Sequence, residues 1–304
     1  MRPPDDHPVS LPGDAVLDPG DLEEAARTAA RRALEEDLGD AGDVTTDAVV
    51  PADRVGRADL VARADGVVAG TALLAITFDL VDPRVTVALE IADGDGVVAG
   101  QRLGTVAGPL RAILTAERTA LNLLTHLSGV ATRTRSFVDA VAGTGCVVRD
   151  TRKTTPGLRL LDKAAVAAGG GVNHRIGLWD ALLVKDNHIA AAGSLELAVR
   201  RALERGGGRH VQVEVTSVEE AEVAIAAGAR DLLLDNLAPP VTQRIVVRVR
   251  ELEADHGRVL LESSGRIDLD TVRDHAMAGV DRVAIGALTH SAPQLDIALD
   301  VQEG

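Results

Sequence analysis

Hydrophobic and polar positions alternate in a regular order along the second half of the chain. Brief apolar runs are separated by segments of helical length and composition. The apolar runs lie at 146–148, 181–184, 211–213, 232–234, 259–261 and 282–285, and the clearest helical segments at 194–205, 217–227, 240–254 and 268–278. Continuous apolar strands that alternate with helices are typical of a parallel sheet covered on both faces. About six repeats of this unit predict an incomplete β/α barrel.

The first half has a different pattern. Residues 1–20 carry five prolines and predict a loose tail, and Asp21 is the expected N-cap of a helix running to about Leu38. Between 57 and 107 short strand-like runs alternate with Gly and Asp, and the string Asp-Gly-Val-Val-Ala-Gly occurs at both 65–70 and 95–100. Two copies predict two similar turn-and-strand units, not a solenoid. A long helix is expected from Thr115 to about Val141.

These patterns predict four segments of the chain. We expect the loose tail over 1–20, a first domain over 21–140, a barrel domain over 141–290, and a C-terminal helix over 291–304 that packs back toward the first domain.

Each apolar run of the second half ends in polar or glycine residues. They are Asp150-Thr151-Arg152-Lys153, Lys185-Asp186-Asn187-His188, Glu214, Asp235-Asn236, Glu262-Ser263-Ser264-Gly265 and Gly286. Residues at the carboxyl ends of consecutive barrel strands converge on one mouth, where barrel enzymes place their active sites. The repetition of this arrangement predicts an enzyme.

The charge of the chain is unevenly distributed along the sequence. The chain has 46 acidic and 32 basic residues, a net charge of −14, which argues against general nucleic-acid or anionic-membrane binding. Residues 149–188 instead hold seven Lys/Arg and four Asp, a local balance of +3. Arg152, Lys153, Arg175 and Lys185 flank predicted strand ends, so we expect a polyanionic substrate. The alternative is a solvated basic face.

Two carboxylates stand opposite these cations. Glu214 and Asp235 each end a predicted strand, where they could hold sugar hydroxyls or Mg²⁺ and stabilise a cationic transition state. The alternative is that each caps the following helix. The single glycines within 264–266 and 285–287, Gly265 and Gly286, would let backbone N–H groups approach a phosphate, although a Ser-Gly step also marks ordinary turns.

Other counts exclude several classes of protein. The single cysteine, Cys146, cannot form an intramolecular disulfide, and three aromatic residues provide no base-stacking platform. The longest apolar stretch, 67–78, is too short to span a bilayer, and 1–11 contains no run of signal-peptide type. We therefore expect a soluble, cytoplasmic protein. Phosphate-loop, dinucleotide-binding and His-rich metal motifs are absent from the sequence.

Several long motifs carry a resemblance to a known family. The runs DTRKTTPGLR (150–159), GGGVNHRIGL (169–178) and KDNH (185–188) closely resemble quinolinate phosphoribosyltransferase, the carboxylating nicotinate-nucleotide pyrophosphorylase of de novo NAD synthesis. Further similar positions lie at 42–46, 117–122, 234–236, 262–265 and 286–291, so the resemblance extends over nearly the whole chain.

The resemblance implies an α/β fold: an N-terminal α/β sandwich domain and an incomplete β/α barrel of the type II phosphoribosyltransferase kind, assembled at least as a homodimer. Arg152, His174, Arg175 and Lys185 would hold the carboxylates of quinolinate, with Arg118 contributed across the subunit interface. The residues expected around phosphoribosyl pyrophosphate are Lys153, Glu214, Asp235, Ser264, Gly265, Arg266, Ile285, Gly286 and Ala287. Thr151 is a further expected substrate-binding residue. Arg266 departs from the family pattern, which usually has a second glycine there.

The implied reaction joins the quinolinate nitrogen to the ribose anomeric carbon, releases pyrophosphate, and then loses CO₂ to give nicotinate mononucleotide. The expected catalytic residues are Lys153, Lys185, Glu214 and Asp235. Mg²⁺ is the expected cofactor, bound through the substrate pyrophosphate, with Glu214 and Asp235 as candidate protein ligands. The alternatives are a pyrophosphorylase-like paralogue with another substrate, a non-catalytic barrel that binds phosphoribosyl pyrophosphate, and a sugar-phosphate isomerase or lyase barrel.

Overall fold

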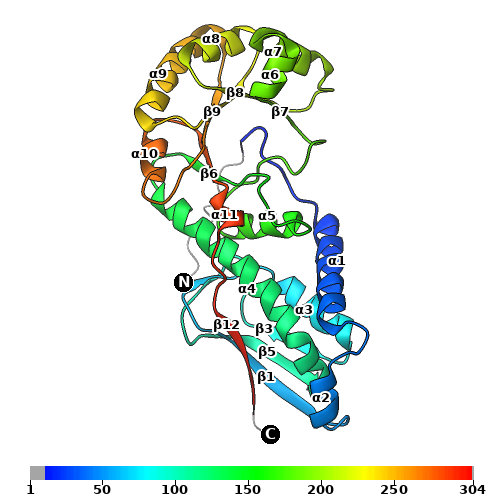
Figure 1. The fold of residues 1–304 in the computed structure, drawn as a ribbon. Helices are drawn as coiled ribbons and strands as arrows, with labels where there is room; N and C mark the ends of the chain where they lie inside the picture. Colours follow the sequence, from blue (N-terminus) through cyan, green and yellow to red (C-terminus); the bar gives the residue numbers. More distant parts are fainter. Residues whose placement is uncertain (1–10, 303–304) are drawn as a thin grey trace. The chain divides into compact units, whose positions relative to one another are not determined.

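A computed structural model describes residues 11–302 and divides into two compact units (Figure 1). The barrel unit contains residues 11–16, 136–153 and 171–287. The sandwich unit contains residues 17–135, 154–170 and 288–302. The sequence therefore passes between the units several times, instead of forming two consecutive domains divided near residue 140.

The barrel unit is built on a six-stranded parallel sheet in the order β6-β11-β10-β9-β8-β7. Its strands are β6 (Val147–Arg149), β7 (Leu182–Val184), β8 (Val211–Val215), β9 (Asp231–Asp235), β10 (Leu260–Ser264) and β11 (Arg282–Ala284). Its helices are α6 (Asp186–Ala192), α7 (Leu195–Arg205), α8 (Val218–Ala226), α9 (Pro239–His256) and α10 (Val272–Met277). Strands β6 and β7 end the sheet and do not pair with each other, which confirms the predicted incomplete barrel.

Two extended segments continue the sheet beyond β6. The N–H of Val172 donates to Val148 O at 2.9 Å, and Val172 O accepts from the N–H of Asp150 at 3.1 Å. The N–H of Ala15 then donates to Asn173 O at 2.9 Å in an antiparallel bridge. The backbone groups of this edge are therefore partly satisfied by chain from outside the regular strands.

The sandwich unit places helices against an antiparallel sheet in the order β12-β1-β5-β3. The strands are β1 (Val55–Ala62), β3 (Thr86–Leu89), β5 (Arg102–Pro109) and β12 (Ile297–Val301), with β2 (Gly66–Val67) and β4 (Gly96–Val97) as a separate antiparallel pair. The helices are α1 (Pro19–Leu38), α2 (Val44–Val49), α3 (Thr71–Val81), α5 (Arg159–Ala168) and α4 (Leu110–Ala140), whose last residues belong to the barrel unit. The short helix α11 (Ala287–His290) follows the barrel.

The core of the sandwich unit follows the two hydrophobic periods. Alternate residues of β1, namely Ala58, Leu60 and Ala62, are buried, as the two-residue period of a strand requires. They share one core with Leu121 and Leu124 of α4, which repeat at helical spacing. The repeated string of the sequence forms β2 and β4, which pair with each other.

Both predictions about the ends of the chain were wrong where the structure describes them. Ile297 and Leu299 are buried on alternate positions of β12, which pairs with the edge of β1, so the expected C-terminal helix is a strand. Residues 11–16 belong to the barrel unit, and α1 begins at Pro19 with Asp18 as its N-cap, so 11–20 is not a loose tail. Residues 1–10 lie outside the described part. Within 11–302, no helix has the length and apolar character needed to cross a membrane.

Candidate active site

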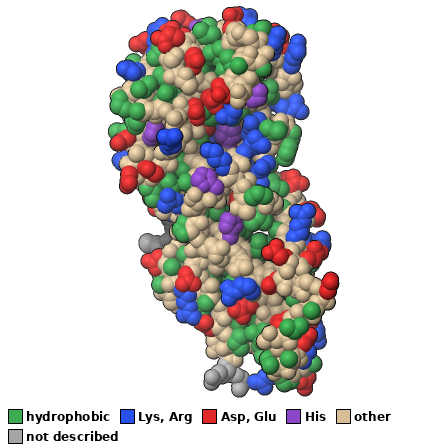
Figure 2. Space-filling model, in the orientation of Figure 1, with side chains coloured by type: hydrophobic (Ala, Val, Ile, Leu, Met, Phe, Trp, Pro, Cys, Tyr) green, Lys and Arg blue, Asp and Glu red, His purple; other side chains and the backbone are tan. Residues whose placement is uncertain are grey.

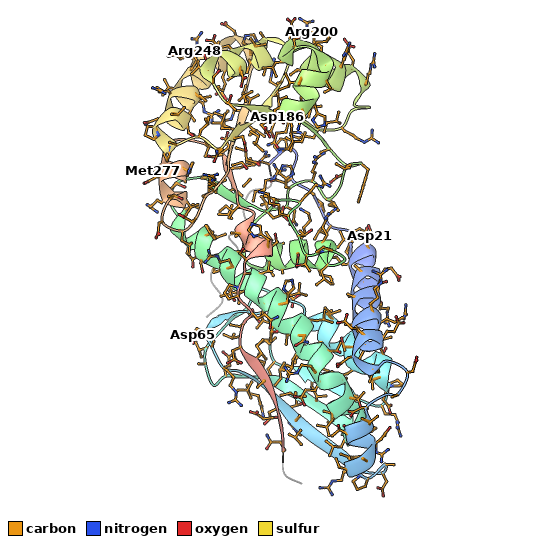
Figure 3. All side chains as sticks on the ribbon, viewed as in Figure 1. Asp21, Asp65, Asp186, Arg200, Arg248 and Met277 are labelled. Atoms are coloured by element: carbon orange, nitrogen blue, oxygen red, sulfur yellow. The ribbon has the colours of Figure 1, made fainter. Side chains whose placement is uncertain are left out.

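The strand ends gather the two carboxylates, a lysine and a serine at one mouth of the barrel. Asp235 and Ser264 are paired residues at the ends of β9 and β10. Lys185 follows β7 beside Glu214 of β8, and Lys185 Nζ lies 2.6 Å from Glu214 Oε2. Figure 3 shows Asp186 at the start of α6, directly after this lysine. The expected convergence of these residues is present in the structure.

Two arginines with buried Nε atoms form the cationic side of the site. The Nε atoms of Arg152 and Arg175 are buried and have no hydrogen-bond partner among residues 11–302. Burial, and next the charge of Arg152, hold the pKa of Arg175 below its usual value. Arg175 Nη1 donates to Ala181 O at 3.0 Å, which fixes one end of its fork. Two like charges with unsatisfied N–H groups are suited to a bound anion.

His174 is buried, and both of its ring nitrogens contact the protein. Nδ1 accepts from the N–H of Arg175 at 2.8 Å, and Nε2 lies 3.1 Å from Gln212 Oε1. The amide nitrogen of Gln212 is occupied as a donor, to Asp231 Oδ1 at 2.9 Å and Glu262 Oε2 at 3.2 Å. Its oxygen is therefore an acceptor, and these contacts assign the Nε2–H tautomer to His174.

The loops after β9 and β10 are in direct contact. The N–H of Asn236 donates to Ser264 O at 2.7 Å. Gly265 has a φ of +100°, and a Cβ there would come 2.8 Å from Asn236 Cα, so only glycine fits without strain. Asn236 and Arg266 have φ values of 54° and 52°, in the left-handed region. Arg266 thus adopts the conformation for which a glycine is favoured, with its side chain exposed.

The remaining predicted site residues lie in three places. Thr151 Oγ1 accepts from the N–H of Lys153 at 3.1 Å in the loop after β6. Ile285 is buried and its N–H donates to Arg149 O at 2.9 Å, while Gly286 and Ala287 follow it. Arg118 is an exposed residue of α4 in the sandwich unit. It therefore belongs to a different unit from the mouth.

Neither carboxylate of the mouth caps a helix. Ser217 caps α8, with its side chain accepting from the N–H of Glu220, and Ala238 is the N-cap position of α9. Glu214 instead forms the ion pair with Lys185. The structural alternative that the sequence left open is therefore wrong for both Glu214 and Asp235.

The basic segment 149–188 does not form one patch. Arg149 points into the barrel interior, where its Nη1 lies 2.6 Å from Glu262 Oε2. Arg159, Asp162 and Lys163 lie on α5 of the sandwich unit. Asp162 is fully buried and accepts from the N–H of Thr155 at 2.9 Å, so this carboxylate anchors a loop. Acidic and basic side chains are interspersed over the face shown in Figure 2.

Sequence reasoning missed a layer of buried polar residues beneath the mouth. Gln212, Asp231, Glu262 and Arg282 come from four consecutive strands and are at most 2% exposed. Burial is the largest single influence and opposes ionisation, but the charges of Arg149 and His174 and the hydrogen bond from Arg149 together hold the pKa of Glu262 below its usual value. Each member precedes a predicted mouth residue by two or four positions, which places both on the same face of the strand. That even spacing is the signal that could have revealed the layer.

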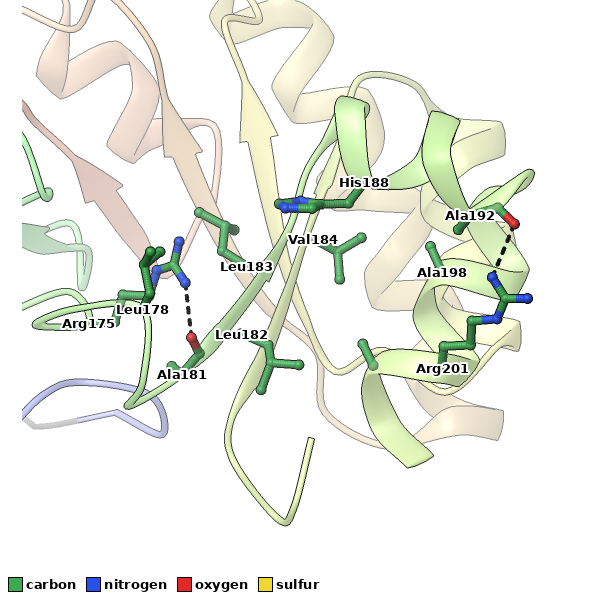
Figure 4. Close-up of a pocket in the computed structure, with 11 residues that line it drawn as sticks. Arg175, Leu178, Ala181, Leu182, Leu183, Val184, His188, Ala192, Ala198 and Arg201 are labelled. Carbon is green, nitrogen blue, oxygen red and sulfur yellow. Dashed lines mark hydrogen bonds between the residues drawn. The ribbon is translucent and has the colours of Figure 1, made fainter. Parts of the chain in front are cut away.

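A cavity of about 360 Å³ lies beside β7 (Figure 4). Its lining is mostly aliphatic and includes Leu182 and Val184 from β7 and Ala198 and Ala202 from α7. Arg175 reaches this cavity from the site, so the cationic side and the open edge of the barrel adjoin.

A dedicated metal cluster is not part of this site. Among residues 11–302, no group of three or more His, Cys, Asp or Glu is arranged to hold a metal ion. Glu214 and Asp235 supply two carboxylates at the mouth. That donor set fits Mg²⁺ only in the form in which the cation is also held by substrate phosphates.

A mouth that joins carboxylates to two arginines with buried, unpaired Nε atoms defines a barrel enzyme that acts on an anionic substrate. Family models give the particular class: quinolinate phosphoribosyl transferase N-terminal domain over residues 43–128 and C-terminal domain over 130–300. The chain belongs to the quinolinate phosphoribosyltransferase family.

Relatives and solved structures agree with this assignment. The chain is 47% identical over 281 residues to a nicotinate-nucleotide pyrophosphorylase [carboxylating] of Mycobacterium leprae, covering 91% of this chain and 98% of the relative. It is 40% identical to a probable enzyme of the same name from Bacillus subtilis, over 88% of this chain and 90% of that one. The crystal structure of NadC from Streptococcus pyogenes is similar with a TM-score of 0.86 and 37% identity, covering 95% of this chain and 99% of that one.

Proposed function

We propose that the chain transfers the phosphoribosyl group of phosphoribosyl pyrophosphate to quinolinate, with loss of pyrophosphate and CO₂, to give nicotinate mononucleotide. The observation that carries this proposal is the pair of buried, unsatisfied Nε atoms of Arg152 and Arg175 beside a mouth with two carboxylates. Quinolinate is a dicarboxylate, and planar guanidinium groups match carboxylates in a bidentate manner. Family membership supports the same substrate.

The first step forms the bond between the quinolinate nitrogen and the ribose anomeric carbon as the bond to pyrophosphate breaks. Arg152 and Arg175 orient the ring through its carboxylates. Lys185 holds the Glu214 carboxylate at 2.6 Å, and Asp235 lies one strand further along the mouth. These two carboxylates stabilise the cationic ribose of the transition state and orient its hydroxyl groups.

The second step breaks the bond between the ring and the carboxylate next to the nitrogen. Ribosylation leaves the ring nitrogen positively charged, so the ring accepts the electron pair released as CO₂ departs. A proton then replaces the carboxylate on that carbon. The other carboxylate stays bound to Arg152 and Arg175 and keeps the product oriented in the site.

Lys153 is placed to balance negative charge on the departing pyrophosphate, since it follows β6 at the mouth. We propose Mg²⁺ as the cofactor, held by the substrate pyrophosphate with Glu214 and Asp235 as candidate ligands. When bound, the cation would offset charge on the leaving group. The backbone of 264–266 and 285–287 is the proposed phosphate-contacting surface, because glycine at 265 and 286 lets it approach closely.

The decisive assay supplies quinolinate, phosphoribosyl pyrophosphate and Mg²⁺ and follows pyrophosphate and CO₂, with nicotinate as the alternative acceptor. Arg152→Lys keeps the charge but loses the planar fork, so we expect quinolinate KM to rise about 30-fold, or roughly 2 kcal/mol. Arg201→Lys, on the far side of the β7 cavity, is the control. Turnover with nicotinate instead of quinolinate, or an unchanged quinolinate KM in Arg152→Lys, would refute the proposal.

We further propose that the enzyme acts in the cytoplasm as at least a homodimer, with Arg118 completing the site of its partner. A shared site makes complementation possible between two inactive variants. Mixing Arg118→Ala with Arg152→Ala is expected to restore turnover, because one mixed site retains both arginines. Absence of any recovery after verified subunit exchange would contradict a shared site.

A further inference from the structure

The N-terminal residues 11–15, here called the N-terminal plug, lie at the end of the barrel opposite the mouth. Gly13 lies against His210, which directly precedes β8 and so marks the amino end of the strands. Gly13 has a φ of +87°, and a Cβ there would come 2.4 Å from the His210 ring. Any larger residue would push the plug away from the barrel.

The plug supplies a buried carboxylate to the polar layer. The side chain of Asp14 is 3% exposed, and its Oδ1 lies 3.2 Å from Arg149 Nε and 3.4 Å from Arg282 Nε. Those arginines are themselves 2% and 0% exposed, and their guanidinium groups also donate to Gly13 O and Pro12 O. Removal of the plug would leave two buried guanidinium groups short of acceptors, which is unfavourable.

Two routes connect the plug to the cationic side of the site. The direct route is the hydrogen bond from the N–H of Ala15 to Asn173 O, at 2.9 Å. Asn173 immediately precedes His174 and Arg175, so this bond fixes the backbone that carries both. The indirect route runs from Asp14 through Arg149 to Glu262, which then accepts from Gln212 at 3.2 Å. Gln212 in turn accepts from His174.

His174 passes this constraint to Arg175. The backbone N–H of His174 donates to Asp150 Oδ1 at 2.6 Å, and His174 Nδ1 accepts from the N–H of Arg175 at 2.8 Å. Because Gln212 requires the Nε2–H tautomer, Nδ1 stays available as the acceptor. The position of the Arg175 backbone therefore depends on contacts that originate at the other end of the barrel.

We propose that the N-terminal plug is a positioning element for the quinolinate side of the active site, acting through Asn173 and the Gln212–His174 pair on Arg175. The proposal rests on the proposed function for its kinetic consequence only. It makes Asp14 and Gln212 positioning residues that never touch the substrate. The plug hydrogen-bonds directly to Asn173, whereas its link to the proposed phosphate-contacting loop 285–287 is indirect, through Arg149, whose carbonyl oxygen accepts from the N–H of Ile285 at 2.9 Å. We therefore expect a larger effect on quinolinate than on phosphoribosyl pyrophosphate.

Two truncations test the proposal as a matched pair. A chain beginning after residue 10 keeps the plug, and one beginning after residue 16 lacks it. We expect the shorter truncation to behave as the full chain. In the longer one we expect quinolinate KM to rise at least about tenfold, while the KM for phosphoribosyl pyrophosphate stays within about twofold, since small displacements of an orienting group are costly.

Hydrogen exchange gives a readout that does not require turnover. Loss of the plug is expected to speed amide exchange across 172–176, with peptides from α9 as the internal reference. Gly13→Ala displaces the plug without shortening the chain and is the second variant if the truncation does not fold; the same two changes are expected from it.

Unchanged exchange at 172–176 together with unchanged quinolinate KM would overturn the proposal. Equal increases in both KM values, with faster exchange throughout the barrel, would also overturn it, because they indicate a structural role alone. If the full-length chain shows no turnover, the proposed function fails, and the exchange measurement still decides the role of the plug.

Discussion

Glu262→Gln is the sharpest test of the buried polar layer. Glu262 is fully buried, and its Oε2 accepts from Arg149 Nη1 at 2.6 Å and from Gln212 Nε2 at 3.2 Å. A glutamine oxygen can keep both contacts, so the variant removes the charge and little else. Breaking a buried ion pair by altering one partner costs about 3–5 kcal/mol. Because both hydrogen bonds survive, we expect the lower end, about 3 kcal/mol.

The matched control is Glu222→Gln, because Glu222 forms an ion pair of the same length as that of Glu262 but on the protein surface. Glu222 Oε1 lies 2.6 Å from Arg248 Nε, and both side chains are about 40% exposed. Exposed pairs of this kind contribute at most about 1 kcal/mol because water screens them. The comparison therefore separates the effect of burial from the effect of distance.

The measurement must report on the barrel unit alone, because a chain of two units need not unfold in one transition. Cys146 precedes β6, is 8% exposed, and is the single cysteine, so pulsed alkylation across a urea series follows the opening of this unit. A loss below about 1 kcal/mol for Glu262→Gln, or equal losses for both variants, would refute the argument that this layer is held by buried charge.

Three further outcomes follow from the structure. Burial raises the pKa of Cys146 to about 12, so alkylation of the native protein at pH 8 should be about a thousandfold slower than for a thiol with the reference pKa of 9.0. Iodoacetamide kinetics with an unfolded control measure this rate, and a native rate near that of the control would contradict the prediction. Arg266→Gly relieves the strain of a left-handed backbone at φ 52° and should raise the free energy of unfolding by up to about 1 kcal/mol. A lower melting temperature in this variant would instead show that the arginine side chain stabilises the loop. The pKa of Glu262 and that of Asp231 are held below their usual values. The stability that these carboxylates contribute is therefore present above their unfolded pKa values and is lost as pH falls through the folded ones. Denaturation at pH 3–6 should show acid destabilisation that is weaker in Glu262→Gln, and identical pH slopes for the two proteins would contradict this.

The barrel was predictable because its signals are local. Apolar runs such as 211–213 and 232–234 became β8 and β9, and the helices between them differ from expectation by only a few residues. The convergence of Lys185, Glu214 and Asp235 also followed, because parallel strands have their carboxyl ends on one side. These features depend on period and order alone, both of which are written in the sequence.

The ends of the chain and the interior layer depend on distant partners instead. Ile297 and Leu299 form a strand only because β1 offers an unpaired edge, and the local sequence does not record that edge. Asp14 is buried only because Arg149 and Arg282, more than a hundred residues away, place guanidinium groups inside the barrel. A proline-rich segment with few apolar residues otherwise resembles a solvated tail.

The polar layer also explains why a barrel with so few aromatic residues can hold two arginines in its interior. Arg149 and Arg282 face Asp14, Asp231 and Glu262, so the buried cations are matched by buried carboxylates from three separate segments of chain. Within residues 11–302, Arg152 and Arg175 at the mouth lack such partners for their Nε atoms. The protein thus neutralises its structural arginines internally, which fits the proposal that the pair at the mouth is neutralised by a bound substrate. A site arranged in this way gains most from an anion that brings two carboxylates at once.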